Sequence, residues 1–338
     1  MLIIMSKSAS DEEVESILEQ IRTMGASEGF VSKGQFHTVI GVVGDPDRVA
    51  ELPLTTYPGV ERIQRVTQPY KLVSHLGHPG TSTIPINGTS IGPGHFTLIA
   101  GPCAIESAEQ AMAAAKAAKA AGAHVLRGDA YKPRTSPYSF QGLAEEGLRI
   151  MSEIRSDLEL PVVMEVLDPS QVEKVAAVAD VIRIGTRNMQ NFSLLSAAGQ
   201  TGKPIMLKRG MTATIEEWLM AAEYVAKSGN SRIILCERGI RTFETATRNT
   251  LDISAVAVVR EESHLPVIVD PSHAVGQKKL VAPLARAAVA AGADGVMIDV
   301  HTEPEKALCD GPQALSSADL MELSADLKAL AKQLGRSF

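Results

Sequence analysis

The chain has 338 residues, of which 45% are hydrophobic and 21% are charged, as in an ordinary folded globular protein. A (β/α)8 barrel takes about 250 residues, so the length fits one barrel plus an attachment of under about a hundred residues. The formal charge of −6 and the 4% of aromatic residues argue against nucleic-acid binding, and no apolar stretch suits a membrane span. Three cysteines without a CxxC pair, and no signal-peptide pattern, predict a cytoplasmic protein.

Residues 1–66 predict a small unit in which strands and helices follow the order βαββαβ. Apolar runs mark four strands, an amphipathic helix is expected over Ser10–Met24, and a short helix is expected over Asp45–Leu52. This order is that of a ferredoxin-like fold. Residues 67–94 are rich in Gly, Pro, Ser and Thr and predict a linker with a hairpin turning at Asn87-Gly88.

Residues 95–338 alternate eight short apolar runs with eight segments of helical length, which is the pattern of a closed (β/α)8 barrel. One of the expected helices covers Thr245–Arg260. An open doubly wound sheet is the competing architecture, but eight repeats over this span favour closure. The fold class predicted is therefore α/β, a TIM barrel with an N-terminal ferredoxin-like α+β domain. The eight runs start near Phe96, His124, Pro161, Val181, Pro204, Arg232, Pro266 and Gly295.

The carboxyl ends of the predicted barrel strands carry polar residues, and in a TIM barrel these ends surround the active site. Four of these residues offer a thiolate, an imidazole and two carboxylates, a set that suits one divalent ion such as Mn, Fe, Co or Zn: Cys103, His273, Asp299 and Asp310. Six more are cations that suit a substrate with several phosphate or carboxylate groups: Arg127, Lys132, Arg134, Arg187, Lys208 and Arg238. Each residue alone also fits a structural role, and the joint pattern carries the prediction.

Several long motifs resemble those of 3-deoxy-D-arabino-heptulosonate 7-phosphate (DAHP) synthases. They are LIAGPCAIES (98–107), RGDAYKPRTSPYSFQGL (127–143), IGTRNMQNF (184–192), LKRGM (207–211), ILCERGIRTFE (234–244), VDPSHAVG (269–276) and HTEPEKALCDGPQAL (301–315). The most similar branch shares a core with 3-deoxy-D-manno-octulosonate 8-phosphate (KDO8P) synthase and carries an N-terminal ferredoxin-like domain. The resemblance implies a metal-dependent condensation of phosphoenolpyruvate with erythrose 4-phosphate that releases phosphate, the first step of the shikimate pathway.

The resemblance also implies roles for the polar residues at the carboxyl ends of the barrel strands. The cations divide into Arg187 and Arg238 for the phosphate of phosphoenolpyruvate, Arg127, Lys132 and Lys208 for its carboxylate, and Arg134 with Thr135 and Ser136 for the sugar phosphate. Lys132 is also expected to donate a proton, Glu165 to position phosphoenolpyruvate or water, and Asp270 to contact the sugar. Glu237 joins the substrate-binding set, and His273 is expected to be catalytic as well as a metal ligand.

Two residues depart from the family pattern. Asp299 stands where glutamate is usual, so its carboxylate must reach further to a metal or bind it through water. Cys309 stands where serine is usual, and we expect it to lie near the metal site and to pair with Cys103 on oxidation.

Other hypotheses remain open at this stage. Pro133-Arg134 after Lys132 favours the four-carbon aldose phosphate, and a KDO8P synthase acting on arabinose 5-phosphate is the second hypothesis. A non-catalytic barrel that binds amino acids, for example beside a chorismate mutase, is the third. The resemblance implies a homotetramer and feedback inhibition by tyrosine or phenylalanine through residues 1–66, whereas a merely stabilising or oligomer-forming module is the alternative.

Overall fold

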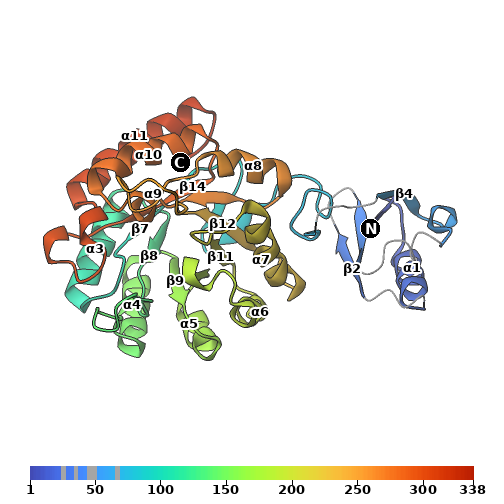
Figure 1. Ribbon diagram of the computed structural model, residues 1–338, viewed down its shortest axis with the longest axis horizontal. Coiled ribbons are helices and arrows are strands. Elements are labelled where there is room, and N and C mark those ends of the chain that lie inside the picture. The colour runs from blue at the N-terminus through green and yellow to red at the C-terminus, as the bar shows by residue number, and fades with distance from the viewer. Residues whose placement is uncertain (24–27, 34–36, 44–51, 65–68) are drawn as a thin grey trace. The chain divides into compact units, whose positions relative to one another are not determined.

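The chain divides into two compact units in the computed structural model, whose ribbon is drawn in Figure 1. One unit comprises residues 1–81 together with 262–264, and the other comprises residues 82–261 together with 265–338. Among the described residues, no helix combines the length and the apolar character needed to cross a membrane. The structure describes residues 1–23, 28–33, 37–43, 52–64 and 69–338.

The N-terminal unit is built on an antiparallel sheet with the strand order β2-β3-β1-β4. This order, with a helix between the first two strands, agrees with the predicted ferredoxin-like fold. The predicted helix over residues 45–52 falls almost entirely outside the described residues. The described elements are β1 (Leu2–Met5), α1 (Asp11–Thr23), β2 (Glu28–Lys33), β3 (Thr38–Val43), the short 3-10 helix Leu54–Thr56 and β4 (Val60–Gln64).

Helix α1 packs on this sheet because its apolar residues recur at helical spacing. Val14, Ile17, Leu18 and Ile21 are buried on one face, and three acidic residues occupy the first turn, where the helix dipole favours negative charge. The buried face joins residues of β1 and β3 in one core. Burial of each such aliphatic side chain stabilises the unit by about 1.5–3 kcal/mol relative to exposure.

The second unit is a closed barrel of eight parallel strands, as predicted. Closure is made by the first and last strands, which pair from Thr97 with Gly295 to Gly101 with Asp299. The strands are β7 (Thr97–Gly101), β8 (Val125–Arg127), β9 (Val162–Val166), β10 (Val181–Ile184), β11 (Ile205–Lys208), β12 (Ile233–Glu237), β13 (Val267–Val269) and β14 (Gly295–Asp299).

Helices surround the barrel strands, as Figure 1 shows. They are α3 (Ala108–Ala120), α4 (Glu145–Leu158), α5 (Val172–Val178), α6 (Phe192–Gln200), α7 (Ile215–Lys227), α8 (Ser254–Glu262), α9 (Pro271–Val275), α10 (Lys278–Ala290) and α11 (Ser317–Gln333). The expected helix Thr245–Arg260 was wrong in its first half, because α8 begins only at Ser254. The backbone N–H groups of Arg248 and Asn249 instead donate to carbonyls of Val275 and Ala274, at 3.1 and 2.8 Å. These bonds hold residues 245–253 as a loop beside α9.

The amino-terminal end of the barrel is filled by apolar side chains and closed by a hairpin. Strands β5 (Ile84–Ile86) and β6 (Thr89–Ile91) pair across the two-residue turn Asn87-Gly88, and Gly88 adopts the positive φ of 79° that such turns require. The hairpin isoleucines share one core with a residue from every barrel strand. These strand residues are Ile99, Val125, Val163, Val181, Met206, Ile234 with Cys236, Ile268 and Met297.

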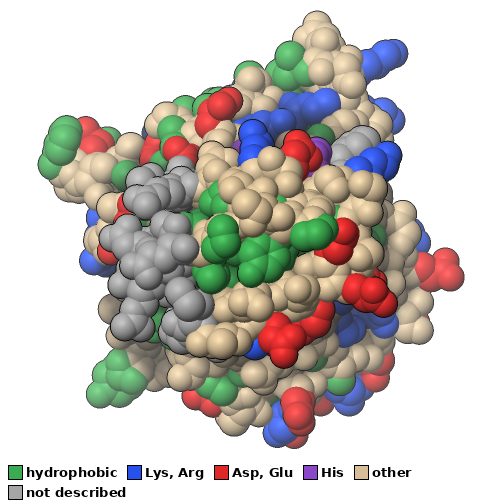
Figure 2. Space-filling view, turned by 90° about the vertical axis from the view of Figure 1, so that its right-hand side faces the viewer, with side chains coloured by type: hydrophobic (Ala, Val, Ile, Leu, Met, Phe, Trp, Pro, Cys, Tyr) green, Lys and Arg blue, Asp and Glu red, His purple; other side chains and the backbone are tan. Residues whose placement is uncertain are grey.

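Charged side chains of both signs are interspersed on the face of the molecule seen in Figure 2. This distribution matches the small net charge of −6. The concentration of charge that matters for function lies inside the barrel, at the opposite end from the hairpin.

Candidate active site

A layer of charged side chains lies directly above the apolar layer of the barrel. Side chains two residues apart on a strand point to the same face, so the next inward positions follow each apolar one by two. From Val125 to Arg127, or from Ile268 to Asp270, the same face changes from apolar to charged. The six charged members of this layer are three cations and three carboxylates: Arg127, Arg183, Lys208, Glu165, Asp270 and Asp299.

Asp129 joins three cations at the floor of the site. Its Oδ2 atom accepts bonds from Lys132 Nζ at 2.9 Å, from Arg127 Nη2 at 3.2 Å and from Arg183 Nη2. Burial alone would raise the pKa of Asp129, but Arg183, Lys132 and Arg127 outweigh it and hold the pKa well below its usual range. Asp129 is therefore an anion that keeps the three cations together.

Glu165 lies on β9 opposite Arg183 of β10 in the strand register, and Arg183 Nη2 donates to Glu165 Oε2 at 2.8 Å. Lys132 Nζ is 4.0 Å from the same oxygen. Gly185 leaves the space that the carboxylate occupies, because a Cβ there would lie 1.8 Å from Glu165 Oε1. The predicted catalytic pair Lys132 and Glu165 thus meets at one place, and Arg183 shares it.

Three candidate metal ligands converge on one point. Cys103 Sγ lies 3.0 Å from Asp310 Oδ2 and 3.7 Å from His273 Nε2, and His273 Nε2 lies 3.5 Å from Asp310 Oδ2. With Asp299 added, one ligand atom from each of the four residues lies within 4.8 Å of every other. The four predicted ligands are therefore brought together, three of them closely.

His273 owes its orientation to α9, which starts directly after β13. Asp270 caps this helix by accepting the His273 N–H at 3.0 Å, and Gly276 ends it with a φ of 67°. The Nδ1 atom of His273 lies 2.9 Å from Asp270 Oδ2, which leaves Nε2 facing Cys103 and Asp310. Burial alone would lower the pKa of His273, but Asp270 and Asp299 outweigh it and raise the pKa to about 10.

Asp299 is held on both oxygens by neighbouring side chains. Arg127 Nη1 donates to Oδ1, and Gln313 Nε2 donates to Oδ2 at 2.5 Å. Gln313 Oε1 in turn accepts from Arg248 Nη1 at 3.1 Å, and the same nitrogen lies 2.9 Å from Asp310 Oδ1. A continuous chain of bonds therefore links the two candidate carboxylate ligands. Asp310 also adopts a left-handed backbone with φ of 57°, which is uncommon outside glycine.

The residues present fit a divalent ion. Metal–ligand lengths of about 2.0–2.3 Å place the ligands of a tetrahedral ion about 3.3–3.8 Å apart. The separations among Cys103, His273 and Asp310 span 3.0 to 3.7 Å, so an ion fits between them with small shifts. A thiol, an imidazole and carboxylates form a mixed donor set that suits Mn, Fe, Co or Zn.

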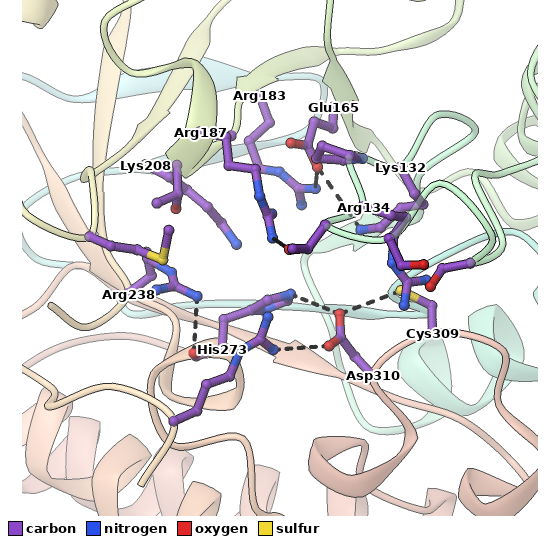
Figure 3. A pocket seen from close by; sticks show the side chains of 18 residues that line it. Lys132, Arg134, Glu165, Arg183, Arg187, Lys208, Arg238, His273, Cys309 and Asp310 are labelled. Carbon is purple, nitrogen blue, oxygen red and sulfur yellow. Dashed lines mark hydrogen bonds and ion pairs between the residues drawn. The ribbon is translucent and has the colours of Figure 1, made fainter. Parts of the chain in front are cut away.

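A polar pocket of about 270 Å³ opens beside this cluster, a size near the lower end for small-molecule sites (Figure 3). His273, Cys309 and Asp310 lie on one side of it, and Glu165 with the cations closes the rest. Two cations of the lining, Arg183 and Arg248, were not predicted; both line the pocket together with the five predicted ones. The seven are Lys132, Arg134, Arg183, Arg187, Lys208, Arg238 and Arg248.

Thr135 and Ser136 also line the pocket, and Arg187 Nη2 lies 3.3 Å from Thr135 Oγ1. The loop after β8 and the turn after β10 therefore meet at the rim. Arg134, which precedes Thr135, and Arg187 both belong to the lining of the pocket, where Figure 3 labels them.

Five predicted site residues do not line the pocket. Arg127 is fully buried and bonds to Asp299, Asp129 and the Cys103 carbonyl. Glu237 accepts from Arg209 Nη1 at 3.0 Å and from the Gly239 N–H at 2.6 Å. The other three, Asp270, Asp299 and Cys103, lie behind the lining among the residues described above.

The site residues that the sequence analysis did not predict differ in whether a sequence pattern could have revealed them. Arg183 sits within the apolar strand β10, at the inward position two residues after Val181, so its parity could have revealed it. Arg248 lies in a loop and Gln313 ends the short 3-10 helix Gly311–Gln313, and neither segment has a periodic pattern. Cys309, expected near the metal site, places its Sγ 3.8 Å from Cys103 Sγ and 3.5 Å from Asp310 Oδ2.

Comparison with known proteins identifies the family. Residues 79–336 match the model of the DAHP synthetase I family, and residues 1–68 match that of the DAHP synthase ferredoxin-like domain. A phospho-2-dehydro-3-deoxyheptonate aldolase of Thermotoga maritima is 50% identical over 335 residues, 99% of each chain. A 2-dehydro-3-deoxyphosphooctonate aldolase of Magnetococcus marinus is 35% identical over 254 residues, 70% of this chain and 87% of the relative.

A solved structure supports the same relationship. The crystal structure of phospho-2-dehydro-3-deoxyheptonate aldolase (DAHP synthase) from Thermotoga maritima superposes with a TM-score of 0.79 at 49% identity, covering 99% of this chain and 98% of that one. A truncated form of the enzyme from the same organism gives a TM-score of 0.74 at 52% identity, over 79% of this chain.

Proposed function

The chain belongs to the DAHP synthetase I family and is an enzyme of the DAHP synthase type, and we propose that it condenses phosphoenolpyruvate with erythrose 4-phosphate in a metal-dependent reaction. One observation carries the choice of substrates: a pocket lined by seven cations lies beside a cluster of metal-ligating side chains. Two phosphates and a carboxylate require several cations at close range. The pocket supplies these cations, although the chain as a whole has a net charge of −6.

Each phosphate has its own set of residues in this proposal. Arg187 and Arg238 bind the phosphate of phosphoenolpyruvate, and Lys208 with Lys132 faces its carboxylate. Arg134, Thr135 and Ser136 bind the sugar phosphate at the rim. The contact between Arg187 and Thr135 supports two neighbouring phosphate sites, because it joins the two sets.

The metal is held by Cys103, His273 and Asp310, with Asp299 as the fourth ligand directly or through water. When bound, a divalent ion supplies Lewis-acid polarisation of the aldehyde oxygen of the sugar. Asp270 supports the site by fixing His273 through Nδ1, and Arg127 with Gln313 fixes Asp299. These outer contacts orient the ligands before the ion arrives.

Lys132 transfers the proton and Glu165 positions the attacking water in this proposal. In the condensation, carbon 3 of phosphoenolpyruvate bonds to the aldehyde carbon, water adds to carbon 2, and the carbon 2–phosphate oxygen bond breaks to release phosphate. Burial alone would lower the pKa of Lys132, but Asp129 and Cys103 raise it well above its usual range. Lys132 is therefore charged and can donate a proton to the new hydroxyl, while Glu165 orients the attacking water. As the carbon 2 carbonyl forms, this water returns one proton to Lys132 and gives the other to the departing phosphate.

A KDO8P synthase acting on arabinose 5-phosphate is the second candidate, supported by the 35% identical Magnetococcus marinus relative. Phosphate release is measured with phosphoenolpyruvate and either erythrose 4-phosphate or arabinose 5-phosphate, before and after chelation of metal. Turnover with erythrose 4-phosphate that stops on chelation and returns with Mn²⁺ is the expected result. Preference for arabinose 5-phosphate would establish the second candidate, and turnover unaffected by chelation would refute metal dependence.

For the N-terminal unit we propose feedback control by tyrosine or phenylalanine, supported by the match of residues 1–68 to the DAHP synthase ferredoxin-like domain. Deletion of residues 1–66 should leave catalysis intact and abolish inhibition by these amino acids in the phosphate-release assay. Inhibition that persists after the deletion would contradict this role. Light scattering of the full chain tests the proposed homotetramer, and addition of a chorismate mutase to the same sample tests that partner.

A further inference from the structure

Arg248 is a cation of the pocket to which the family resemblance assigns no role. It lies in the loop between β12 and α8, which carries none of the four candidate metal ligands. Its side chain is 40% exposed and lines the pocket together with His273 and Asp310. Its contacts with these residues and their neighbours, rather than its burial, indicate what it does.

The two carboxylate oxygens of Asp310 face different neighbours. Oδ2 lies 3.0 Å from Cys103 Sγ and 3.5 Å from His273 Nε2, the other two closely placed ligands. Oδ1 instead accepts a hydrogen bond from Arg248 Nη1 at 2.9 Å. Figure 3 shows Asp310 beside His273 and Cys309, with dashed lines to both. An ion bound through Oδ2 therefore leaves the bond to Arg248 in place.

The backbone around Asp310 does little to orient its side chain. Asp310 follows β14 in a loop and adopts a left-handed φ of 57°. Its carboxylate does not cap the short 3-10 helix Gly311–Gln313, all of whose residues the structure describes. Asp270, by contrast, is fixed by capping α9. The direction of the Asp310 carboxylate therefore depends on the side chains that contact it.

The same nitrogen of Arg248 reaches the second candidate carboxylate ligand through Gln313. Gln313 is 2% exposed, its Oε1 accepts from Arg248 Nη1 at 3.1 Å, and its Nε2 donates to Asp299 Oδ2 at 2.5 Å. An amide whose oxygen accepts from an arginine must present its N–H groups to the other side, where Asp299 lies. Arg248 thereby sets the orientation of the Gln313 amide.

Arg248 is itself placed by bonds to α9, the helix that carries His273. The backbone N–H of Arg248 donates to the Val275 carbonyl at 3.1 Å, and Asn249 Nδ2 donates to the His273 carbonyl at 3.3 Å. Gly276 permits this approach, because a Cβ there would lie 2.9 Å from Arg248 Cβ. One loop therefore contacts two candidate metal ligands that follow different strands.

We propose that Arg248 is a positioning residue of the metal site, which orients the carboxylate of Asp310 directly and that of Asp299 through Gln313. This inference rests on the proposed metal dependence and adds a residue that does not itself ligate the ion. A partly exposed ion pair contributes little energy alone, so the effect lies in the orientation of the ligands before the ion binds. Loss of such an outer contact usually weakens metal binding by about 10- to 100-fold.

The test measures metal binding without turnover. The full chain is freed of metal with a chelator and titrated with Co²⁺, whose visible spectrum reports both the occupancy of the site and the geometry of its ligands. In Arg248→Gln the Kd for Co²⁺ should rise by about 10- to 100-fold, and the spectrum at saturation should change. Arg248→Lys, which keeps a cation beside Asp310 Oδ1, should recover at least part of the loss. An unchanged Kd and spectrum in Arg248→Gln would overturn the proposal.

Arg286→Gln is the matched control. The Arg286 side chain is 41% exposed and pairs with Asp326 at 2.7 Å, outside the lining of the pocket. This variant should leave the Kd for Co²⁺ and the spectrum unchanged. An equal loss in both variants would show an effect of general stability, and a raised KM for either substrate with an unchanged Kd for Co²⁺ in Arg248→Gln would show that Arg248 binds substrate; either result would overturn the proposal.

Two further outcomes keep the test decisive. If Arg248→Gln does not fold, a crystal structure of the unmodified chain with Co²⁺ decides. One Asp310 oxygen on the ion and the other within about 3.2 Å of Arg248 supports the proposal, and an Arg248 turned away from Asp310 refutes it. Failure of the unmodified chain to bind Co²⁺ would refute the proposed metal site itself, a result distinct from equal binding by the unmodified chain and the variant.

Discussion

The two ends of the barrel use the same strands for opposite purposes. At the amino-terminal end the inward residues are aliphatic and pack against the isoleucines of the β5–β6 hairpin. Two residues further along six of the eight strands, the inward side chains are charged and are held by one another rather than by packing. The apolar end supplies stability, whereas the charged end is costly to build because each buried charge must be paired.

This difference shows where function costs stability in the fold. The charged layer contains as many cations as carboxylates, so its charges are compensated before any ligand binds. Among the described residues, the guanidinium of Arg183 keeps unused donors: Nε has no hydrogen-bond partner, and Nη1 contacts only the thioether of Met297. Four experiments can break or sharpen the contrast between the two ends.

The largest effect on activity is expected when a cysteine of the charged end is replaced, in comparison with a cysteine of the apolar core. Cys103→Ala should abolish metal binding and lower kcat by at least about 100-fold, because the other ligands lose a closely placed partner. Cys236→Ala, in the apolar layer, should keep metal and activity and lower the free energy of unfolding by about 1 kcal/mol. Metal content of the purified variants and phosphate release are the measurements. Full activity in Cys103→Ala would remove Cys103 from the ligand set.

Oxidation of two cysteines at the charged end should inactivate the enzyme reversibly. Hydrogen peroxide can take two electrons and two protons from Cys103 and Cys309, whose sulfurs lie 3.8 Å apart, giving a disulfide and two waters. Activity should fall with metal loss and return with dithiothreitol, while Cys309→Ser should resist the disulfide-dependent loss. Mass spectrometry that finds Cys103 free in the oxidised, inactive protein would contradict this prediction.

At the apolar end, Ile86→Ala should affect stability and spare catalysis. Ile86 is 3% exposed within the core that the hairpin shares with the strands, so its truncation should cost about 2–4 kcal/mol. Urea unfolding gives the free energy, and kcat should stay within about twofold. A tenfold fall in kcat would show that the two ends are not independent.

The smallest effect is a pH dependence of stability at the apolar end. Burial and the charge of His95 lower the pKa of His124 from 6.5 to about 4, and His124 Nδ1 accepts the Leu98 N–H at 3.0 Å. A lowered histidine pKa contributes stability above pH 6.5 that is lost as the pH falls toward 4. The urea midpoint should therefore drop between pH 7 and pH 5, and His124→Gln should reduce that drop. An identical drop in the variant would exclude His124 as the cause.

The alternation of eight short apolar runs with segments of helical length was enough to predict the closed barrel, and the charged residues that follow those runs predicted a polar site at the carboxyl ends of the strands. What it did not reveal are the partners of each charge. Arg127 and Arg183 occupy equivalent inward positions on their strands. Only the residues that bond to each arginine decide which one lines the pocket and which one does not. The apolar spacing of residues 245–253 predicted a helix. Backbone N–H groups of this segment instead donate to carbonyls of α9, and a local sequence pattern does not reveal such a distant contact. Gln313 was also not predicted, because its importance lies in side-chain bonds to Asp299 and Arg248, which belong to other segments of the chain.

The pairing of β7 with β14 has a consequence for how the protein is made. The barrel cannot close while its last strand is still inside the ribosome, because Thr97 needs Gly295 beside it. The N-terminal sheet needs only the first 64 residues, so it can form early in translation. A nascent chain therefore carries a complete N-terminal sheet and an open parallel sheet with two unpaired edges for most of its synthesis, the stage at which such chains are most prone to aggregate.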